Sequence, residues 1–154
     1  MDAIDLKILE QLQIDAKVSM VSLAEKVGLS EPACYRRVRQ LRTSGHIEKE
    51  VAVIKPKTMG WPLSMMLMVQ LERDHGSIVN QFIDRVNQAP EVLDSWYVTG
   101  DFDVVLQVVA TDMEAFDEFT QRVLHKDGSV KSVKTLVVMR HSKMAGPIPP
   151  AFDR

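Results

Sequence analysis

Four arginines lie close together in the sequence, Arg36, Arg37, Arg39 and Arg42. A guanidinium group stays charged and offers paired N–H donors, so it binds phosphate oxygens and the acceptor atoms of guanine. The whole chain of 154 residues has a formal net charge of -2, so this basic cluster is a local feature. It is either a nucleic-acid-binding surface or the solvated face of a helix.

The residues between these arginines predict an amphipathic helix from residue 31 to about residue 43. Cys34, Val38 and Leu41 follow the spacing of a buried helical face. Ser30 is a favourable N-cap for this helix. Arg36 and Arg39 then point to solvent. The other two arginines lie near the edges of the apolar face, where they contact phosphates or brace the fold.

Two more helices are expected before this one, over residues 2–13 and 21–27, with a glycine at residue 28 to end the second. A short helix, a turn and a helix with outward arginines predict a helix-turn-helix over residues 22–41, whose second helix enters the major groove of DNA. Charge alone favours a solvated face equally. The predicted DNA-binding residues are Ser30, Pro32, Tyr35, Arg36, Arg37, Arg39, Gln40, Arg42 and Lys49.

Residues 46–54 alternate in part and are rich in β-branched side chains, which predicts a strand or a small ribbon. This wing would carry Lys49 beside the DNA backbone. A winged helix-turn-helix domain is therefore expected over residues 1–54. Residues 55–62 contain two prolines and a glycine, which is typical of a linker.

The second half of the chain predicts the order strand, helix, strand, strand, helix, strand. The strands are expected at 63–71, 92–99, 102–110 and 130–139, and the helices at 77–88 and 112–125. This β-α-β-β-α-β order is ferredoxin-like. The fold class is therefore α+β, with a second domain over residues 63–140 and a proline-containing tail over residues 141–154.

The first strand of this domain is apolar on both of its faces, and so is most of the third. Two helices cover only one face of a four-stranded sheet. An apolar face that stays uncovered needs a partner, so we expect dimerisation through the sheet. The methionines at 65, 66 and 68 are expected to fill the core and this interface.

The stretch V-T-G-D-F-D at residues 98–103 has two interpretations. As structure, Gly100 and Asp101 form a tight hairpin turn that Thr99 and Asp103 stabilise. As a site, exposed backbone N–H groups beside carboxylates bind both ends of a zwitterion. The residue types by themselves favour the structural interpretation.

Five segments carry a more specific pattern: I-D-L-K-I-L at 4–9, L-A-E-K-V-G-L-S at 23–30, C-Y-R-R-V at 34–38, G-H-I at 45–47, and V-T-G-D-F-D at 98–103. In this order they resemble the Lrp/AsnC (feast/famine) family of transcription regulators over about residues 2–140. The resemblance implies a regulator that binds double-stranded DNA at pseudo-palindromic operators. It also implies dimers that assemble into an octamer-type ring, with an amino acid as the usual effector.

The resemblance changes the preferred interpretation of the turn, which in this family borders an effector pocket between dimers. Thr135 matches a family position that also faces the pocket. The effector-binding residues that it implies are Val98, Thr99, Gly100, Asp101, Phe102, Asp103 and Thr135. The family commonly has Tyr where this chain has Phe102, so this chain has no phenolic hydroxyl at that position. The identity of the ligand does not follow.

Two other classes of protein are alternatives. In a metabolic enzyme, Asp101 and Asp103 would be a catalytic pair, but no nucleophile with its base and no Gly-rich phosphate loop accompanies them. A stand-alone amino-acid-binding module would lack the N-terminal domain. We therefore expect no enzyme, no catalytic residue, no metal site and no cofactor other than the amino-acid effector. Cys34 is expected to be buried rather than a redox switch.

The charge differs between the two halves of the chain. Residues 1–60 contain ten Lys or Arg and eight Asp or Glu, whereas residues 61–154 contain nine and thirteen. The longest apolar run, residues 65–69, is far shorter than the about 20 residues that cross a bilayer. The acidic N-terminus does not resemble a signal peptide. A cytoplasmic protein without a membrane partner is expected.

Overall fold

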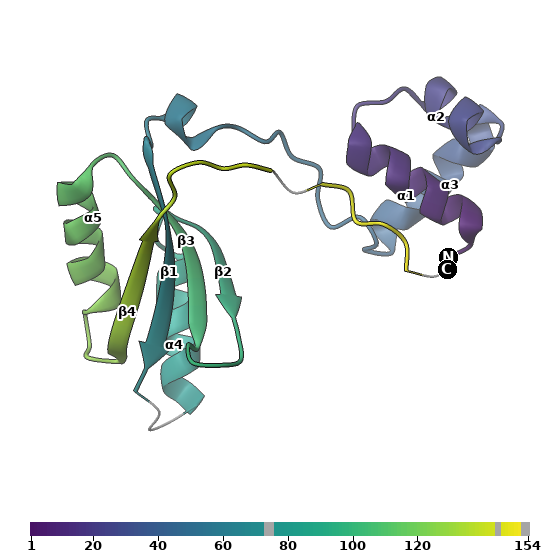
Figure 1. The fold of residues 1–154 in the computed structure, drawn as a ribbon. Helices are drawn as coiled ribbons and strands as arrows, with labels where there is room; N and C mark the ends of the chain where they lie inside the picture. Colours follow the sequence, from purple (N-terminus) through teal and green to yellow (C-terminus); the bar gives the residue numbers. More distant parts are fainter. Residues whose placement is uncertain (73–75, 144–145, 152–154) are drawn as a thin grey trace. The chain divides into compact units, whose positions relative to one another are not determined.

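The computed structural model describes residues 1–72, 76–143 and 146–151. Contacts divide the chain into two compact units, residues 1–52 together with 142–154, and residues 53–141 (Figure 1). Each unit has a hydrophobic core of its own. Each therefore buries its apolar side chains by itself, as domains do.

The N-terminal unit contains three helices, α1 (Ala3–Ile14), α2 (Met20–Val27) and α3 (Glu31–Thr43). Their bounds lie within about one residue of those predicted from the apolar periodicity. Ile8 of α1, Leu23 of α2 and Val38 of α3 are buried together at the centre of this unit. The apolar stripe of α3 therefore faces α1 and α2, and its other side faces solvent.

The ends of these helices follow from their sequences. Asp2 and Asp5 form a reciprocal capping box at the start of α1. The Ser19 hydroxyl accepts a hydrogen bond from the backbone N–H of Ser22 and caps α2. Gly28 ends α2 at a φ of 75°, which a residue with a side chain adopts only with strain. This sharp stop separates α2 from α3 by a three-residue turn.

The predicted wing is wrong for this chain: residues 48–55 form no strand. Val51, Val53 and Ile54 are exposed. A strand needs a neighbour to pair its backbone groups, and these residues have none in the part of the chain that the structure describes. The fold class is therefore a helix-turn-helix without a wing, followed by the predicted ferredoxin-like domain.

The C-terminal unit contains a 3₁₀-helix at Pro56–Met59 before its first strand. It contains four strands and two helices in the predicted order, which are β1 (Leu63–Leu71), α4 (Gly76–Asn87), β2 (Val92–Tyr97), β3 (Val104–Ala110), α5 (Met113–Phe119) and β4 (Val130–Val137). A π-helical turn over Thr120–Leu124 continues α5. The strands form one antiparallel sheet in the order β2-β3-β1-β4.

Helices α4 and α5 cover one face of this sheet. Phe82 of α4 and Phe119 of α5 are buried in the same core as Leu67 of β1 and Leu106 of β3. The strands alternate as expected, because successive side chains point to opposite faces of a sheet. Every second residue of β1, from Met65 to Leu71, is therefore buried beneath the helices.

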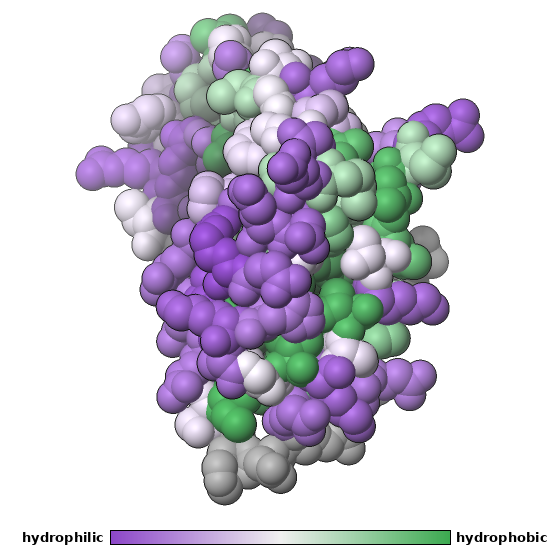
Figure 2. All heavy atoms as spheres, turned by 90° about the vertical axis from the view of Figure 1, so that its left-hand side faces the viewer, coloured by the Kyte–Doolittle hydropathy of each residue, from purple (hydrophilic) through white to green (hydrophobic). Residues whose placement is uncertain are grey.

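The opposite face of the sheet carries apolar side chains that neither α4 nor α5 covers. Met66 and Met68 of β1 are half-buried there, and Trp96 of β2 and Leu136 of β4 are exposed. Figure 2 views the molecule from the side where α5 and β4 lie in Figure 1, and apolar surface (green) interrupts the hydrophilic side chains there. The apolar side chains of Met66, Met68, Trp96 and Leu136 are the second apolar face predicted from β1.

The hairpin between β2 and β3 is wider than predicted. The strands end at Tyr97 and resume at Val104, so residues 98–103 form a six-residue loop rather than a two-residue turn. One backbone hydrogen bond closes this loop, from the N–H of Val98 to the carbonyl of Asp103 at 2.9 Å. Residues 99–102 lie inside this loop and are not part of the hydrogen-bond ladder between β2 and β3.

Candidate functional site

Helix α3 presents two of its arginines to solvent, and neither has a partner among the residues that the structure describes. Arg36 and Arg39 are exposed, and among the described residues neither makes an ion pair or a hydrogen bond. Both lie opposite the buried stripe of Cys34, Val38 and Leu41. An unpaired guanidinium on the outer face of a helix keeps all its donors available for phosphates or base edges.

Arg37 has a different environment, because it is bound to the first turn of α1. Its Nη1 lies 2.7 Å from Oδ2 of Asp2 and 2.8 Å from Oδ1 of Asp5. These two carboxylates raise the pKa of Arg37, with Asp5 as the larger cause. The hydrogen bond from the backbone of Asp5, and then Arg37, lower the pKa of Asp2. Arg37 therefore braces α3 against α1.

Arg42 is also paired. Its Nη2 lies 2.8 Å from Oε1 of Glu50, and its Nε donates to the same oxygen at 3.3 Å. This pairing holds residues 46–50 against the end of α3. The four arginines thus divide into two that are unpaired and two that connect α3 to other parts of its unit.

The other predicted DNA-binding residues all lie on the surface: Ser30, Pro32, Tyr35, Gln40 and Lys49 are exposed. Ser30 occupies the N-cap position of α3, but its side chain makes no capping hydrogen bond. Its hydroxyl stays available beside the helix N-terminus, where anions bind. Lys49 lies in the irregular segment after α3 rather than on a wing.

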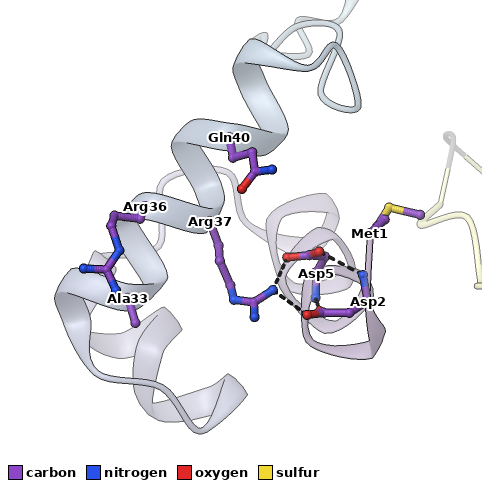
Figure 3. Close-up of a pocket in the computed structure, with 7 residues that line it drawn as sticks. All are labelled: Met1, Asp2, Asp5, Ala33, Arg36, Arg37 and Gln40. Atoms are coloured by element: carbon purple, nitrogen blue, oxygen red, sulfur yellow. Dashed lines mark hydrogen bonds and ion pairs between the residues drawn. The ribbon is translucent and has the colours of Figure 1, made fainter.

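A hollow of about 500 Å³ separates α3 from the start of α1. It is lined by Met1, Asp2, Asp5, Ala33, Arg36, Arg37 and Gln40. Figure 3 shows the side chain of Arg37 reaching from α3 to both carboxylates, while Arg36 points away from them. The two carboxylates therefore line the same hollow as Arg36, one of the two outward arginines of α3.

The loop over residues 98–103 exposes its central backbone. Thr99, Gly100 and Asp101 are exposed, and Gly100 has a φ of 126°, which favours glycine. Within the described residues, the backbone N–H groups of residues 99–102 donate no hydrogen bond. Consecutive unpaired N–H groups are suited to a carboxylate, and the Asp101 side chain beside them is suited to an ammonium group.

Asp103 has a structural role in this loop. Its Oδ2 accepts a hydrogen bond from the backbone N–H of Leu71 at 2.8 Å, and its own N–H donates to the carbonyl of Val69 at 2.9 Å. It therefore fixes the loop to the end of β1. Val98 and Phe102 are half-buried on either side of the exposed part.

Thr135 does not lie beside this loop within one chain. It pairs with Leu67 of β1, which pairs with Leu106 of β3. Two strand spacings, about 10 Å, and a further three residues along the strands, about 10 Å, separate it from Asp103. Thr135 is exposed at the edge of the sheet.

Cys34 is fully buried, as predicted, and burial raises the pKa of its thiol. In residues 1–72, 76–143 and 146–151 there is no cluster of three metal-ligating side chains. Over the same ranges, none of the helices combines the length and hydrophobicity of a membrane crossing.

The sequence pattern does not reveal the full role of two residues of this site. Acidic residues at a helix start favour the helix dipole, and Asp2 and Asp5 in addition bind Arg37. The D-x-x-D spacing before an apolar stripe is a capping signal that indicates fixed carboxylates. No spacing rule connects this turn with an arginine more than thirty residues later.

Both parts of the chain match known domain families. The AsnC-type helix-turn-helix domain matches residues 1–42, and the Lrp/AsnC ligand binding domain matches residues 64–148. The N-terminal match decides against a stand-alone ligand-binding module.

Relatives span the whole chain. An HTH-type transcriptional regulator of Sinorhizobium fredii is 40% identical over 149 residues, which cover 97% of this chain and 88% of that protein. The leucine-responsive regulatory protein of Rhizobium meliloti is 37% identical over 145 residues, covering 94% and 93%. A transcriptional regulator from Neisseria meningitidis, solved as a complex with L-Met, superposes with a TM-score of 0.88 at 31% identity and covers 97% of this chain and 96% of its own. The chain therefore belongs to the Lrp/AsnC family of transcriptional regulators, with a helix-turn-helix DNA-binding domain and a ligand-binding domain.

Proposed function

We propose that this regulator contacts its operator through α3, with Arg36 and Arg39 at base edges or phosphates. The observation that carries the proposal is the unpaired state of these two arginines beside two paired ones. Ser30, Pro32, Tyr35, Gln40 and Lys49 surround them on the same surface and complete the DNA-binding surface. A dimer would present two such helices to a pseudo-palindromic site.

The effector of this proposal is an amino acid that binds at residues 98–103. The unpaired N–H groups of residues 99–102 would receive its carboxylate, and Asp101 its ammonium group. The L-Met complex of the Neisseria meningitidis regulator supports the class of ligand. We assign this site to binding alone, without a catalytic step.

Thr135 enters the site only through a second chain in this proposal. The separation within one chain exceeds the reach of a small amino acid, so the turn of one subunit and Thr135 of another would meet between dimers. In this arrangement two chains form a dimer through the uncovered face of the sheet, and several dimers form a ring such as an octamer. The turn of one subunit and Thr135 of another would then lie side by side. Apolar side chains such as Met66 and Met68 on that face support the dimer interface.

A thermal-shift screen of the full chain with the twenty amino acids tests the effector. A ligand that binds only the native state raises the unfolding midpoint with its concentration. We expect a subset of amino acids to raise the midpoint for the wild type and not for Asp101→Ala. Equal shifts for both proteins would contradict the placement at residues 98–103, and no shift with any amino acid would contradict the class of ligand.

A further inference from the structure

The first turn of α1 divides its carboxylate oxygens between two tasks. Oδ1 of Asp2 accepts from the backbone N–H groups of Ile4 and Asp5, and Oδ2 of Asp5 accepts from the N–H of Asp2. The remaining oxygens, Oδ2 of Asp2 and Oδ1 of Asp5, both bind Nη1 of Arg37. The capping box therefore fixes two carboxylates at the position where Arg37 is held.

This cluster carries more negative than positive charge. Two carboxylates face the single guanidinium of Arg37, so these three side chains together carry a formal charge of -1, in a hollow that Arg36 and Gln40 also line (Figure 3). Negative charge beside a DNA-contacting helix opposes phosphate binding of any sequence. It leaves bidentate contacts to base edges unchanged, since those depend on geometry.

We infer that Asp2 and Asp5 limit the DNA affinity of this protein, because they withhold Arg37 from DNA phosphates and so lower affinity for DNA of any sequence. The inference rests on the proposed role of α3 at the DNA. Under it, Arg37 is a positioning residue and Arg36 and Arg39 make the direct contacts. Because a phosphate contact carries no sequence information, its absence lowers the affinity for operator and for other DNA alike and leaves their ratio unchanged.

The test compares Asp2→Asn/Asp5→Asn with the wild type, since Asn keeps a capping oxygen but has no charge. Binding of the full chain is measured by fluorescence anisotropy at several KCl concentrations. The probes are an operator duplex, selected from a random library with the wild type, and a scrambled duplex. A matched control, Glu10→Gln/Asp15→Asn, removes two charges from the region of α1 away from Arg37.

We expect the Asp2→Asn/Asp5→Asn variant to bind the operator and the scrambled duplex more tightly by a similar factor, because an added phosphate contact does not depend on sequence. The slope of log affinity against log salt should steepen by about 0.9 for each α3 at the DNA, which is the effect of one added phosphate contact. In an Arg37→Gln background the same two substitutions should leave the slope unchanged. A merely structural cluster would lower the unfolding midpoint without steepening the slope.

Three results would overturn the inference: an unchanged slope, weaker binding of both duplexes, or an equal steepening in the matched control. Failure of the proposed function has a different signature. A wild type with no preference for any duplex, or Arg36→Ala/Arg39→Ala with wild-type affinity, would reject α3 as the DNA-binding helix. The salt slope of the Asp2→Asn/Asp5→Asn variant is measured separately from both of these results.

Discussion

Helix α3 and its N-cap carry every proposed DNA contact except Lys49, whereas the proposed effector site combines a loop with Thr135 on a strand two places away in the sheet. Apart from Ser30 and Lys49, the residues of the first surface lie within the thirteen consecutive residues of one helix. The second is incomplete within one chain. A surface on one helix depends on local periodicity, while a site across a sheet depends on strand order and on other subunits.

The two sites share one feature, which is a division between bracing and unpaired groups. On α3, Arg37 and Arg42 are held by carboxylates, and Arg36 and Arg39 are unpaired among the described residues. In the loop, Asp103 is bonded to the end of β1, and Asp101 is exposed. Residues of one type at neighbouring positions therefore have different roles, and substitutions can separate them.

The largest effect is expected on α3. The double substitution Arg36→Ala/Arg39→Ala should weaken operator binding by about 1–3 kcal/mol for each bidentate hydrogen-bonded pair that it removes, with a smaller salt slope. The oligomer should stay intact, because both side chains are exposed. Anisotropy titrations and analytical ultracentrifugation measure the two quantities. Unchanged affinity and slope would remove the distinction between unpaired and bracing arginines.

The next largest effect is a difference in stability between substitutions of the two aspartates of the loop, Asp101 and Asp103. Asp103→Ala leaves the N–H of Leu71 without its acceptor and should lower the free energy of unfolding by about 1–3 kcal/mol. Asp101→Ala should change it by less than about 0.5 kcal/mol, as exposed substitutions do. Chemical denaturation measures both. Similar decreases in stability would mean that Asp101 also holds the fold.

A pH-dependent effect is expected in the C-terminal unit. Arg85 binds Asp127, and this ion pair, with hydrogen bonds from Ser129, holds the pKa of Asp127 well below its ordinary value. A carboxylate with a depressed folded pKa contributes stability above its unfolded pKa of about 3.9, and this contribution disappears as the pH falls further. Asp127→Asn should flatten the acid side of the stability curve between about pH 5 and 2. An unchanged curve would assign acid unfolding to other carboxylates.

The smallest effect compares two serines at helix N-caps. Ser19→Ala removes a capping hydrogen bond of α2 and should cost about 1 kcal/mol. Ser30→Ala removes no such bond from α3 and should cost less than about 0.5 kcal/mol. Its effect should fall on DNA affinity instead. Thermal denaturation of both variants measures the difference, and equal decreases in stability would show that Ser30 caps α3 in solution.

Much of the N-terminal unit could be predicted from its sequence. Apolar spacing and capping residues fixed all three helices, because both signals act within a few residues along the chain. The β-branched residues Val51, Val53 and Ile54 misled the prediction, since strand propensity has no effect without a strand to pair with. The partners of Arg37 could not be predicted, since α1 and α3 meet only in three dimensions.

The sequence by itself determined the order of the elements, the buried stripe of α3 and the exposed Gly100–Asp101 segment, because each depends on residues close together in the chain. Tertiary structure decided which charges stay unpaired: packing of α3 on α1 brings Arg37 to Asp2 and Asp5, and pairing of β1 with β3 brings Asp103 to Leu71. Those partners lie about thirty residues apart, a distance over which helical and strand periodicity carry no information.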